Sequence, residues 1–244
     1  MRALVLAIAA SLAIGIHARP AATETVDLEL MLAVDISGSI DTVEATLQRE
    51  GYLKALTHPS VIAAITSGRH RRVAIAYMEW GGPLWQYTLV DWTVVRDAAS
   101  ARAFAGKIAK KPVHTVAWTS ISNAIDHAVE AFAKNPHNGA RRVLDISGDG
   151  RNNKGGPLAP ARARALAQGI TINGLPILND RPNAYGQPID KHLDEYYRTE
   201  VIGGAGAFIV VAKGFKAFAA AIRAKLVREI AGLGAPATLR TAGR

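Results

Sequence analysis

The chain has 244 residues, of which 49% are hydrophobic and 20% are charged, and its formal net charge is +9 at pH 7. This length and composition fit one large α/β domain with a buried core, and they exclude a disordered chain, a collagen and a coiled coil. The sequence contains no cysteine, which excludes disulfide scaffolds, thiolate zinc sites, iron–sulfur clusters and cysteine nucleophiles.

Residues 1–22 resemble a secretory signal peptide. The basic Arg2 precedes the apolar run 3–16, and small residues follow that run. The run is shorter than the roughly 20 apolar residues of a membrane-spanning helix. We therefore predict cleavage between residues 19 and 24, with an uncleaved membrane anchor as the alternative. No transmembrane anchor is predicted for the mature chain, which favours a periplasmic protein over one secreted to the exterior.

Strands and helices alternate along the predicted domain, residues 24–231. Apolar runs predict the strands, and apolar stripes at helical spacing predict the helices. In chain order the first elements are a strand at 26–34, a helix at 41–65, strands at 72–78 and 84–92, and helices at 97–110 and 120–134. A strand at 142–147, a helix at 159–168, a strand at 170–177, a short helix at 189–199, a strand at 207–211 and a helix at 215–230 follow. The tail 232–244 is predicted to be disordered.

Two local signals add detail to this order. Asp41 and Glu44 form a capping pair at the start of the first helix, and the Gly81–Pro83 break predicts a hairpin whose second strand is antiparallel. Helices alternating with strands predict a three-layer, doubly wound α/β fold with a mainly parallel sheet and one antiparallel edge strand. In such sheets a ligand binds beyond the carboxyl ends of the strands.

Oxygen-bearing side chains gather where three of these elements end or begin. Asp35, Ser37 and Ser39 follow the first strand, Thr119 precedes a helix, and Asp149 follows the fourth strand. Two carboxylates and three hydroxyls, without nitrogen or sulfur, suit a hard divalent cation such as Mg²⁺ or Mn²⁺. The alternative for the first three residues is a strand-to-helix turn, because aspartate and serine are common in turns and caps.

These residues, in this order and at these separations, resemble the metal-ion-dependent adhesion site of von Willebrand factor A domains. The matching motifs are Asp35-Ile-Ser-Gly-Ser, Thr119 five residues before Ala124-Ile125, and Asp149-Gly150. The resemblance covers nearly the whole mature chain. Within that superfamily, the Asp35 motif and three others are similar to those of a bacterial group of exported, uncharacterised von Willebrand A-like proteins: Tyr77-Met-Glu-Trp, Trp118-Thr-Ser-Ile-Ser and Ser147-Gly-Asp-Gly-Arg-Asn-Asn.

The resemblance implies a role for each residue of the site. Ser37, Ser39 and Thr119 would be direct or near-direct ligands, and Asp35 and Asp149 would bind the cation directly or through water. The chain departs from the superfamily at two places: Trp118 stands where glycine is common, and Ser147-Gly148 stands where a threonine is common. Neither departure removes a ligand.

Three further residues are candidates for a rim around the site: Glu79, Trp80 and Trp118. The alternative for Glu79 is a salt bridge, and the alternative for the two tryptophans is packing beneath the loops. Glu79 is also the one side chain that suggests a metal-dependent hydrolase, because no other general base lies close in sequence to the site. No catalytic residue is assigned.

We expect an exported, non-enzymatic module that uses a divalent cation to capture an acidic group of a protein partner. Two aspartates balance a dication, and the near-neutral centre can accept one more oxygen anion from an Asp or Glu of the partner. A structural domain with an unused site is the other alternative. Without residues 1–22 the chain keeps 27 basic and 20 acidic side chains, and these basic residues form no long block interleaved with aromatics, so no nucleic acid partner is expected. The sequence leaves the oligomeric state open.

Overall fold

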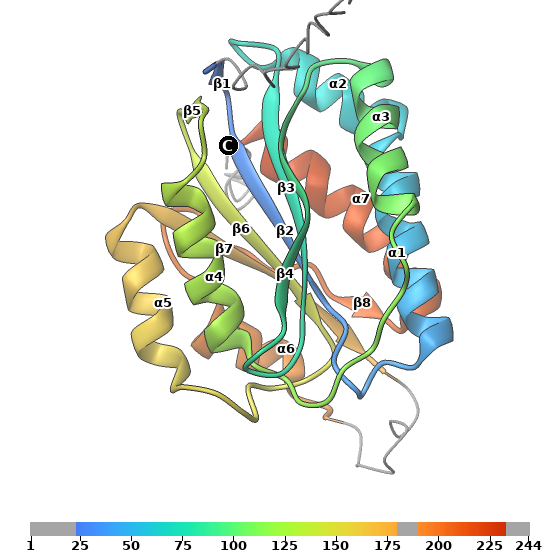
Figure 1. Ribbon diagram of the computed structural model, residues 1–244, viewed down its shortest axis with the longest axis vertical. Coiled ribbons are helices and arrows are strands. Elements are labelled where there is room, and N and C mark those ends of the chain that lie inside the picture. Colours follow the sequence, from blue (N-terminus) through green and yellow to red (C-terminus); the bar gives the residue numbers. More distant parts are fainter. Residues whose placement is uncertain (1–22, 180–189, 233–244) are drawn as a thin grey trace, which may run out of the picture.

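A six-stranded sheet forms the middle layer of the computed structural model, which describes residues 23–179 and 190–232 (Figure 1). The strands, in their order across the sheet, are β4 (Gln86–Val95), β3 (Val73–Trp80), β2 (Glu29–Asp35), β6 (Arg142–Gly148), β7 (Ile170–Leu178) and β8 (Ala212–Lys213). All neighbouring strands are parallel except β3 and β4. The predicted mainly parallel sheet with one antiparallel edge strand is confirmed. The predicted signal peptide, and the predicted tail from residue 233 onward, lie outside the described residues.

Helices cover both faces of this sheet (Figure 1). One face carries α1 (Thr42–Leu56), α2 (Pro59–Ser67), α3 (Ala98–Ala109) and α7 (Phe215–Ala231). The other carries α4 (Ile121–Ala133), α5 (Leu158–Ala167), α6 (Leu193–Tyr196) and the π-helix η1 (Tyr197–Val201). Successive residues of β2 point to opposite faces, so Leu30 and Leu32 join the first core while Met31 and Ala33 join the second.

The predicted strand at 26–34 is two strands. A short strand β1 (Thr25–Val26) pairs with β5 (Asn138–Gly139) in a separate two-stranded sheet, and β2 begins three residues later. Asp27 lies in the interruption, and its carboxylate accepts hydrogen bonds from the backbone N–H of His70 at 2.9 and 3.0 Å. The interruption places Asp27 where its side chain holds the loop that precedes β3.

The prediction of a single helix at 41–65 is wrong, because two helices occupy this part of the chain. The capping box of Asp41 and Glu44 starts α1 as predicted, but the helix ends at Leu56 and α2 begins at Pro59. The residue before a proline disfavours the helical region. His58 accordingly has extended backbone angles, φ −72° and ψ 139°, and caps α2.

The last predicted strand is displaced. Residues 207–211 pair with the backbone of β7 at one isolated bridge, between Gly174 and Ile209, and β8 forms just after them. The predicted short helix at 189–199 contains α6 and continues as η1 to Val201. In the parts of the chain that the structure describes, no helix combines the length and hydrophobicity of a membrane-spanning segment.

Candidate metal site

The candidate site lies at the carboxyl edge of the sheet, where β2 and β6 run side by side. Asp35 is the last residue of β2, and Asp149 follows the last residue of β6. The chain leaves β2 toward α1 on one face and leaves β6 toward α5 on the other (Figure 1). Two adjacent strands whose connections diverge to opposite faces form the crevice in which doubly wound folds bind ligands.

The turn after β2 is shaped by Asp35 itself. Its Oδ1 accepts a hydrogen bond from the N–H of Ser37 at 2.7 Å, which closes an Asx-type turn. The hydroxyls of Ser37 and Ser39 then lie 3.0 Å apart, and Ser39 donates to Asp149 Oδ1 at 2.5 Å. From α1, Gln48 donates to the carbonyl of Asp35 at 2.7 Å. Four of the five residues predicted for the site are therefore linked by direct contacts.

Thr119 reaches the same place from the loop before α4. A methyl group added at Gly150, the residue after Asp149, would lie 3.5 Å from Thr119 Oγ1. The N–H of Thr119 donates to Asn153 Oδ1 at 2.9 Å, and its carbonyl accepts from the N–H groups of Asn153 and Lys154 at 2.9 and 3.2 Å. The loops after β6 and before α4 are thus fastened to each other through the backbone of Thr119.

Two buried aspartates with raised pKa values lie at this site. Burial raises the pKa of Asp35 well above its ordinary value, and the nearby carboxylate of Asp149 raises it further. Burial raises the pKa of Asp149 to about 6; the hydrogen bond from Ser39 opposes this rise, and the charge of Glu44 adds to it. Asp35 is fully buried, and its Oδ2 has no hydrogen-bond partner among the described residues. A buried carboxylate oxygen without a partner is costly unless a cation or water satisfies it.

The donor set fits a divalent cation held by oxygen. Across residues 23–179 and 190–232 no three His, Cys, Asp or Glu side chains are grouped as metal ligands. A cation at this edge would therefore depend on hydroxyls as well as on the two carboxylates. Oxygen donors of this kind suit Mg²⁺, Mn²⁺ or Ca²⁺ better than softer metals.

The sequence as a whole assigns the chain to a family. Residues 25–234 match the family model described as "Protein of unknown function (DUF1194)". The chain belongs to the DUF1194 family. No curated protein matches the sequence of this DUF1194 chain.

Solved structures show that this DUF1194 chain has the von Willebrand factor A fold. A "von Willebrand factor type A" protein from Catenulispora acidiphila superposes with a TM-score of 0.59 at 15% identity, over 84% of this chain and 43% of that one. Proximal thread matrix protein 1 from the mussel byssus, "with zinc occupied MIDAS motif", gives 0.62 at 14% identity, over 86% and 50%. The pilus adhesin SpaC from Lactobacillus rhamnosus GG gives 0.61 at 14%, over 86% and 31%. The DUF1194 chain thus spans half or less of the length of these proteins, and the family resemblance is confirmed at the level of fold.

Several residues around the site were not predicted from the sequence. Asn153 holds Thr119, and Asn152 accepts the N–H of Ser122 at 3.0 Å while its own N–H donates to Tyr196 at 3.2 Å. The two asparagines directly after Asp149-Gly-Arg were a usable signal, because asparagine often caps loops. Tyr197 of η1 also lies at the site, because a methyl group added at Gly148 would meet both its hydroxyl, at 2.9 Å, and Asp35 Oδ2, at 2.7 Å. No local sequence pattern indicated this position, since η1 reaches the site only through tertiary packing.

Two of the three rim candidates are not at a rim. Trp80 pairs with Asp35 across β2 and β3 and so lies beside the site, but its side chain is fully buried in the second core. The prediction that its indole is an exposed rim is therefore wrong, and the alternative of packing describes it. Glu79 is 3% exposed and pairs with Arg49, whose Nη2 lies 2.5 Å from Glu79 Oε1. Burial raises the pKa of Glu79 and the Arg49 guanidinium opposes that rise. Trp118 alone is exposed, at 56%.

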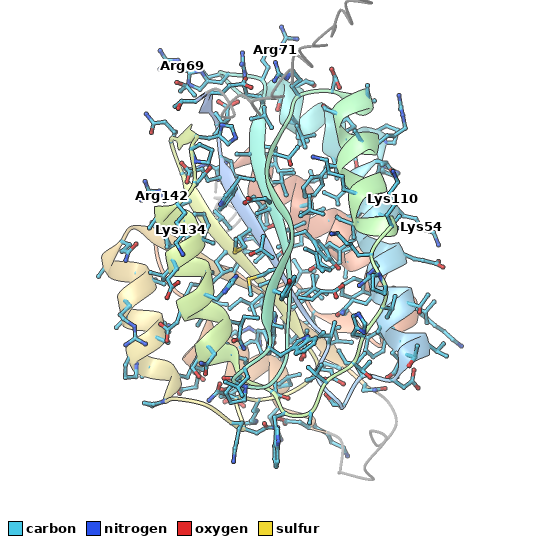
Figure 2. The ribbon with its side chains drawn as sticks, in the orientation of Figure 1. Lys54, Arg69, Arg71, Lys110, Lys134 and Arg142 are labelled. Carbon is cyan, nitrogen blue, oxygen red and sulfur yellow. The ribbon has the colours of Figure 1, made fainter. Side chains whose placement is uncertain are left out.

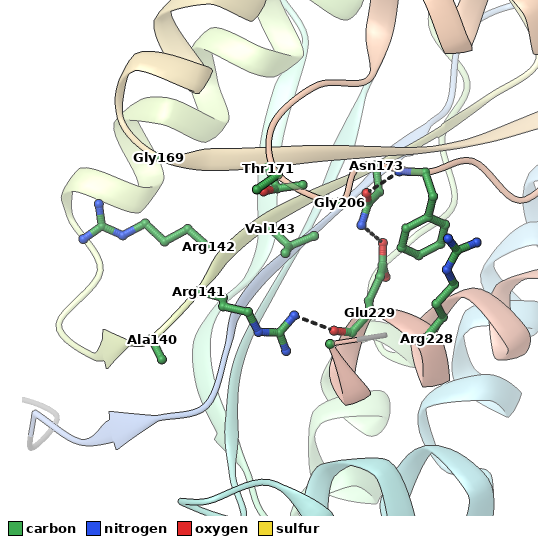
Figure 3. A pocket seen from close by; sticks show the side chains of 13 residues that line it. Ala140, Arg141, Arg142, Val143, Gly169, Thr171, Asn173, Gly206, Arg228 and Glu229 are labelled. Atoms are coloured by element: carbon green, nitrogen blue, oxygen red, sulfur yellow. Dashed lines mark hydrogen bonds between the residues drawn. The ribbon is translucent and has the colours of Figure 1, made fainter. Parts of the chain in front are cut away.

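A separate cavity of about 310 Å³ lies near the amino ends of β6 and β7, away from Asp35 and Asp149 (Figure 3). Three arginines line it, but their guanidinium groups do not converge. Arg141 donates to two carbonyls at the end of α7, each at 2.9 Å. Arg142 lies 3.5 Å from Glu29, and Arg228 stacks 3.7 Å above the ring of Phe208. Arg141 and Arg228 therefore fasten α7 to its surroundings, and Arg142 pairs with β2.

Basic side chains elsewhere are spread over the surface. The six labelled in Figure 2 come from different helices, strands and loops and point outward: Lys54, Arg69, Arg71, Lys110, Lys134 and Arg142. Lys54 and Lys134 form exposed ion pairs with glutamates one helical turn away. Such pairs contribute little to stability.

Proposed function

We propose that this chain is an exported protein-binding module that uses a divalent cation to capture an acidic group of a partner protein. The observation that carries the proposal is the buried, unpartnered Oδ2 of Asp35, in a site where four further oxygen-bearing residues from three loops lie together. The five donors proposed for the cation are Asp35, Ser37, Ser39, Thr119 and Asp149.

The charges of these residues explain why the captured group would be acidic. The two aspartates bring two negative charges, and the serine and threonine hydroxyls are neutral, so the site balances a dication without excess. Mg²⁺ or Mn²⁺ bound there would supply a coordination position for one more oxygen anion. A carboxylate of a partner protein fits this requirement, and the positive net charge of the chain favours its approach.

The comparisons give this proposal two kinds of support. One protein with the same fold carries a zinc-occupied MIDAS motif, and another is a pilus adhesin. The resemblance of residues 1–22 to a signal peptide supports export, and we propose the periplasm as the compartment.

The position of Glu79 favours a binding module over a metal-dependent hydrolase. The hydrolase alternative needs Glu79 as a general base, but its carboxylate is buried and held by Arg49 and also lies 3.4 Å from the hydroxyl of Tyr77. A base tied to a guanidinium is poorly placed to accept a proton from water. Glu79→Gln is therefore expected to leave metal binding intact.

The experiment is calorimetric titration of the protein with magnesium chloride and manganese chloride. We expect a Kd on the order of 10⁻⁴ to 10⁻³ M, as for weak extracellular cation modules, and loss of binding in both Asp35→Ala and Thr119→Ala. Asp126→Ala, which removes a partly exposed aspartate paired with Arg164, is the matched control and should bind as the parent does. Thermal unfolding of each variant in EDTA establishes that it is folded. Equal binding by the parent and Asp35→Ala, or no binding by the parent in the millimolar range, contradicts the proposed metal site.

A further inference from the structure

An exposed apolar surface lies next to the candidate metal site. Its four large side chains are Leu84, Trp85, Tyr87 and Trp118, with exposed fractions of 97%, 43%, 65% and 56%. In the described part of the chain only two other large hydrophobic residues are exposed, both on α1. We call these four residues the aromatic platform, after its three aromatic members. Exposed aromatic side chains that gather in one place are typical of protein-binding surfaces.

The platform and the metal site share the same backbone. The turn between β3 and β4 carries Leu84 and Trp85, β4 carries Tyr87 as its second residue, and the loop before α4 carries Trp118. Ser120 donates its N–H to the carbonyl of Gly81 at 2.8 Å, and Val116 donates to Ile36, inside the loop of the site, at 2.9 Å. A methyl group at Gly81 would lie only 2.2 Å from Val116, so the turn and the loop are in close contact. The platform is therefore held in a fixed position relative to Asp35 and Thr119.

Trp118 adopts a backbone conformation that is unfavourable for its side chain. Its φ is +69°, in the left-handed region that glycine adopts freely and that a bulky residue adopts at a cost of about 1–2 kcal/mol. The indole ring nevertheless stands exposed, with the ammonium of Lys154 lying 5.0 Å from its centroid. Strained residues of this kind cluster at binding and active sites.

We propose that the aromatic platform is the second half of the partner-binding surface. The partner is a protein that presents, in one exposed segment, an acidic side chain together with a large apolar side chain. The inference rests on the proposed function, because the metal site fixes where the acidic side chain binds. The neighbouring apolar side chain then packs on Trp118 and Trp85, and the ammonium of Lys154 complements the negative charge of the segment.

The test is a selection from a display library of random peptides on the immobilised protein in magnesium chloride, with elution by EDTA. We expect the eluted peptides to carry Asp or Glu close to Trp, Tyr, Phe or Leu. One such peptide is then synthesised and its affinity is measured by calorimetry for the parent, Trp118→Gly, Leu47→Ala and Asp35→Ala.

Trp118→Gly removes the indole of the platform without straining the backbone, because glycine accepts the positive φ at this position. This variant should keep the magnesium affinity and the Tm of the parent or exceed that Tm, and it should bind the peptide at least about tenfold more weakly, as expected for loss of an aromatic anchor. Leu47, 41% exposed on α1, provides the matched control, and Leu47→Ala should leave the peptide affinity unchanged.

The outcomes distinguish this inference from the proposed function. Eluted peptides that are acidic but lack large apolar residues, or an unchanged peptide affinity in Trp118→Gly, overturn the role of the platform and leave cation-dependent capture standing. Peptide binding that persists in Asp35→Ala, or a selection in which EDTA releases no peptide, overturns the proposed function and this inference with it.

Discussion

Replacing Gly148 by alanine tests whether the packing around Asp35 defines the site. Gly148 ends β6, and a methyl group there would lie 2.7 Å from Asp35 Oδ2, 2.9 Å from the Tyr197 hydroxyl and 3.2 Å from Asp35 Cβ. Asp35 and Tyr197 are both fully buried, so neither side chain can move into solvent. Overpacking of this kind costs about 1–3 kcal/mol. The methyl group also displaces the Asp35 carboxylate from the position in which it faces the other donors.

The assay is thermal unfolding in EDTA, followed by titration with magnesium chloride. For a domain of this size a loss of about 2 kcal/mol lowers the Tm by roughly 4–8 °C, and we expect magnesium affinity to fall as well. Gly106→Ala is the matched control: it makes the same change inside α3, where the methyl group meets nothing within 4 Å, and it should raise stability by about 0.5–1 kcal/mol. If Gly148→Ala has the Tm and the magnesium affinity of the parent, the close packing of Gly148 against Asp35 is not required for the site.

Two further predictions concern buried charges. Burial raises the pKa of Glu229 from 4.5 to about 7, and the charge of Asp145 adds to this rise. Between these two pH values the folded protein keeps a proton that the unfolded chain releases. The free energy of unfolding therefore falls with rising pH, by up to about 3 kcal/mol. Glu229→Gln should reduce the fall of the Tm between pH 4.5 and 7, leaving the part that Asp35 and Asp149 cause, and a slope equal to that of the parent refutes the assignment. Arg49→Met leaves Glu79 buried without its partner and should lower the unfolding free energy in urea by about 3–5 kcal/mol. Adding Glu79→Gln should restore part of this loss, and Lys54→Met, at an exposed pair, should cost less than about 1 kcal/mol; equal losses at the two sites contradict the reasoning.

The layers and the general location of the site could be predicted because they follow from local patterns. The alternation of apolar strands with amphipathic helices predicted a mainly parallel sheet, and parallel strands end at one edge. Asp35 and Asp149 had to lie at that edge once each was placed after a strand. The capping pair of Asp41 and Glu44 marked the start of α1 for the same local reason.

The failures arise where tertiary packing decides. Nothing local to Trp80 indicates that it is buried in the second core while Trp118, at a strained φ, is exposed. The pairing of Glu79 with Arg49 joins residues 30 positions apart in the sequence, and no periodic pattern predicts it. The break before Pro59 is different, because a proline is a local signal that a helix ends before it. The prediction missed the break because the apolar residues keep helical spacing on both sides of the proline.

The order of the strands has a consequence for how the protein folds. The central strand β2 lies between β3 and β6, and the contact between Ser39 and Asp149 joins residues 110 positions apart. Contacts so distant in sequence close large loops and slow the folding of parallel sheets. The two aspartates come together only where β2 and β6 pair, so the proposed cation site can form only after these two strands have paired. The rate at which magnesium binding develops during refolding would therefore measure the formation of the central strand pair.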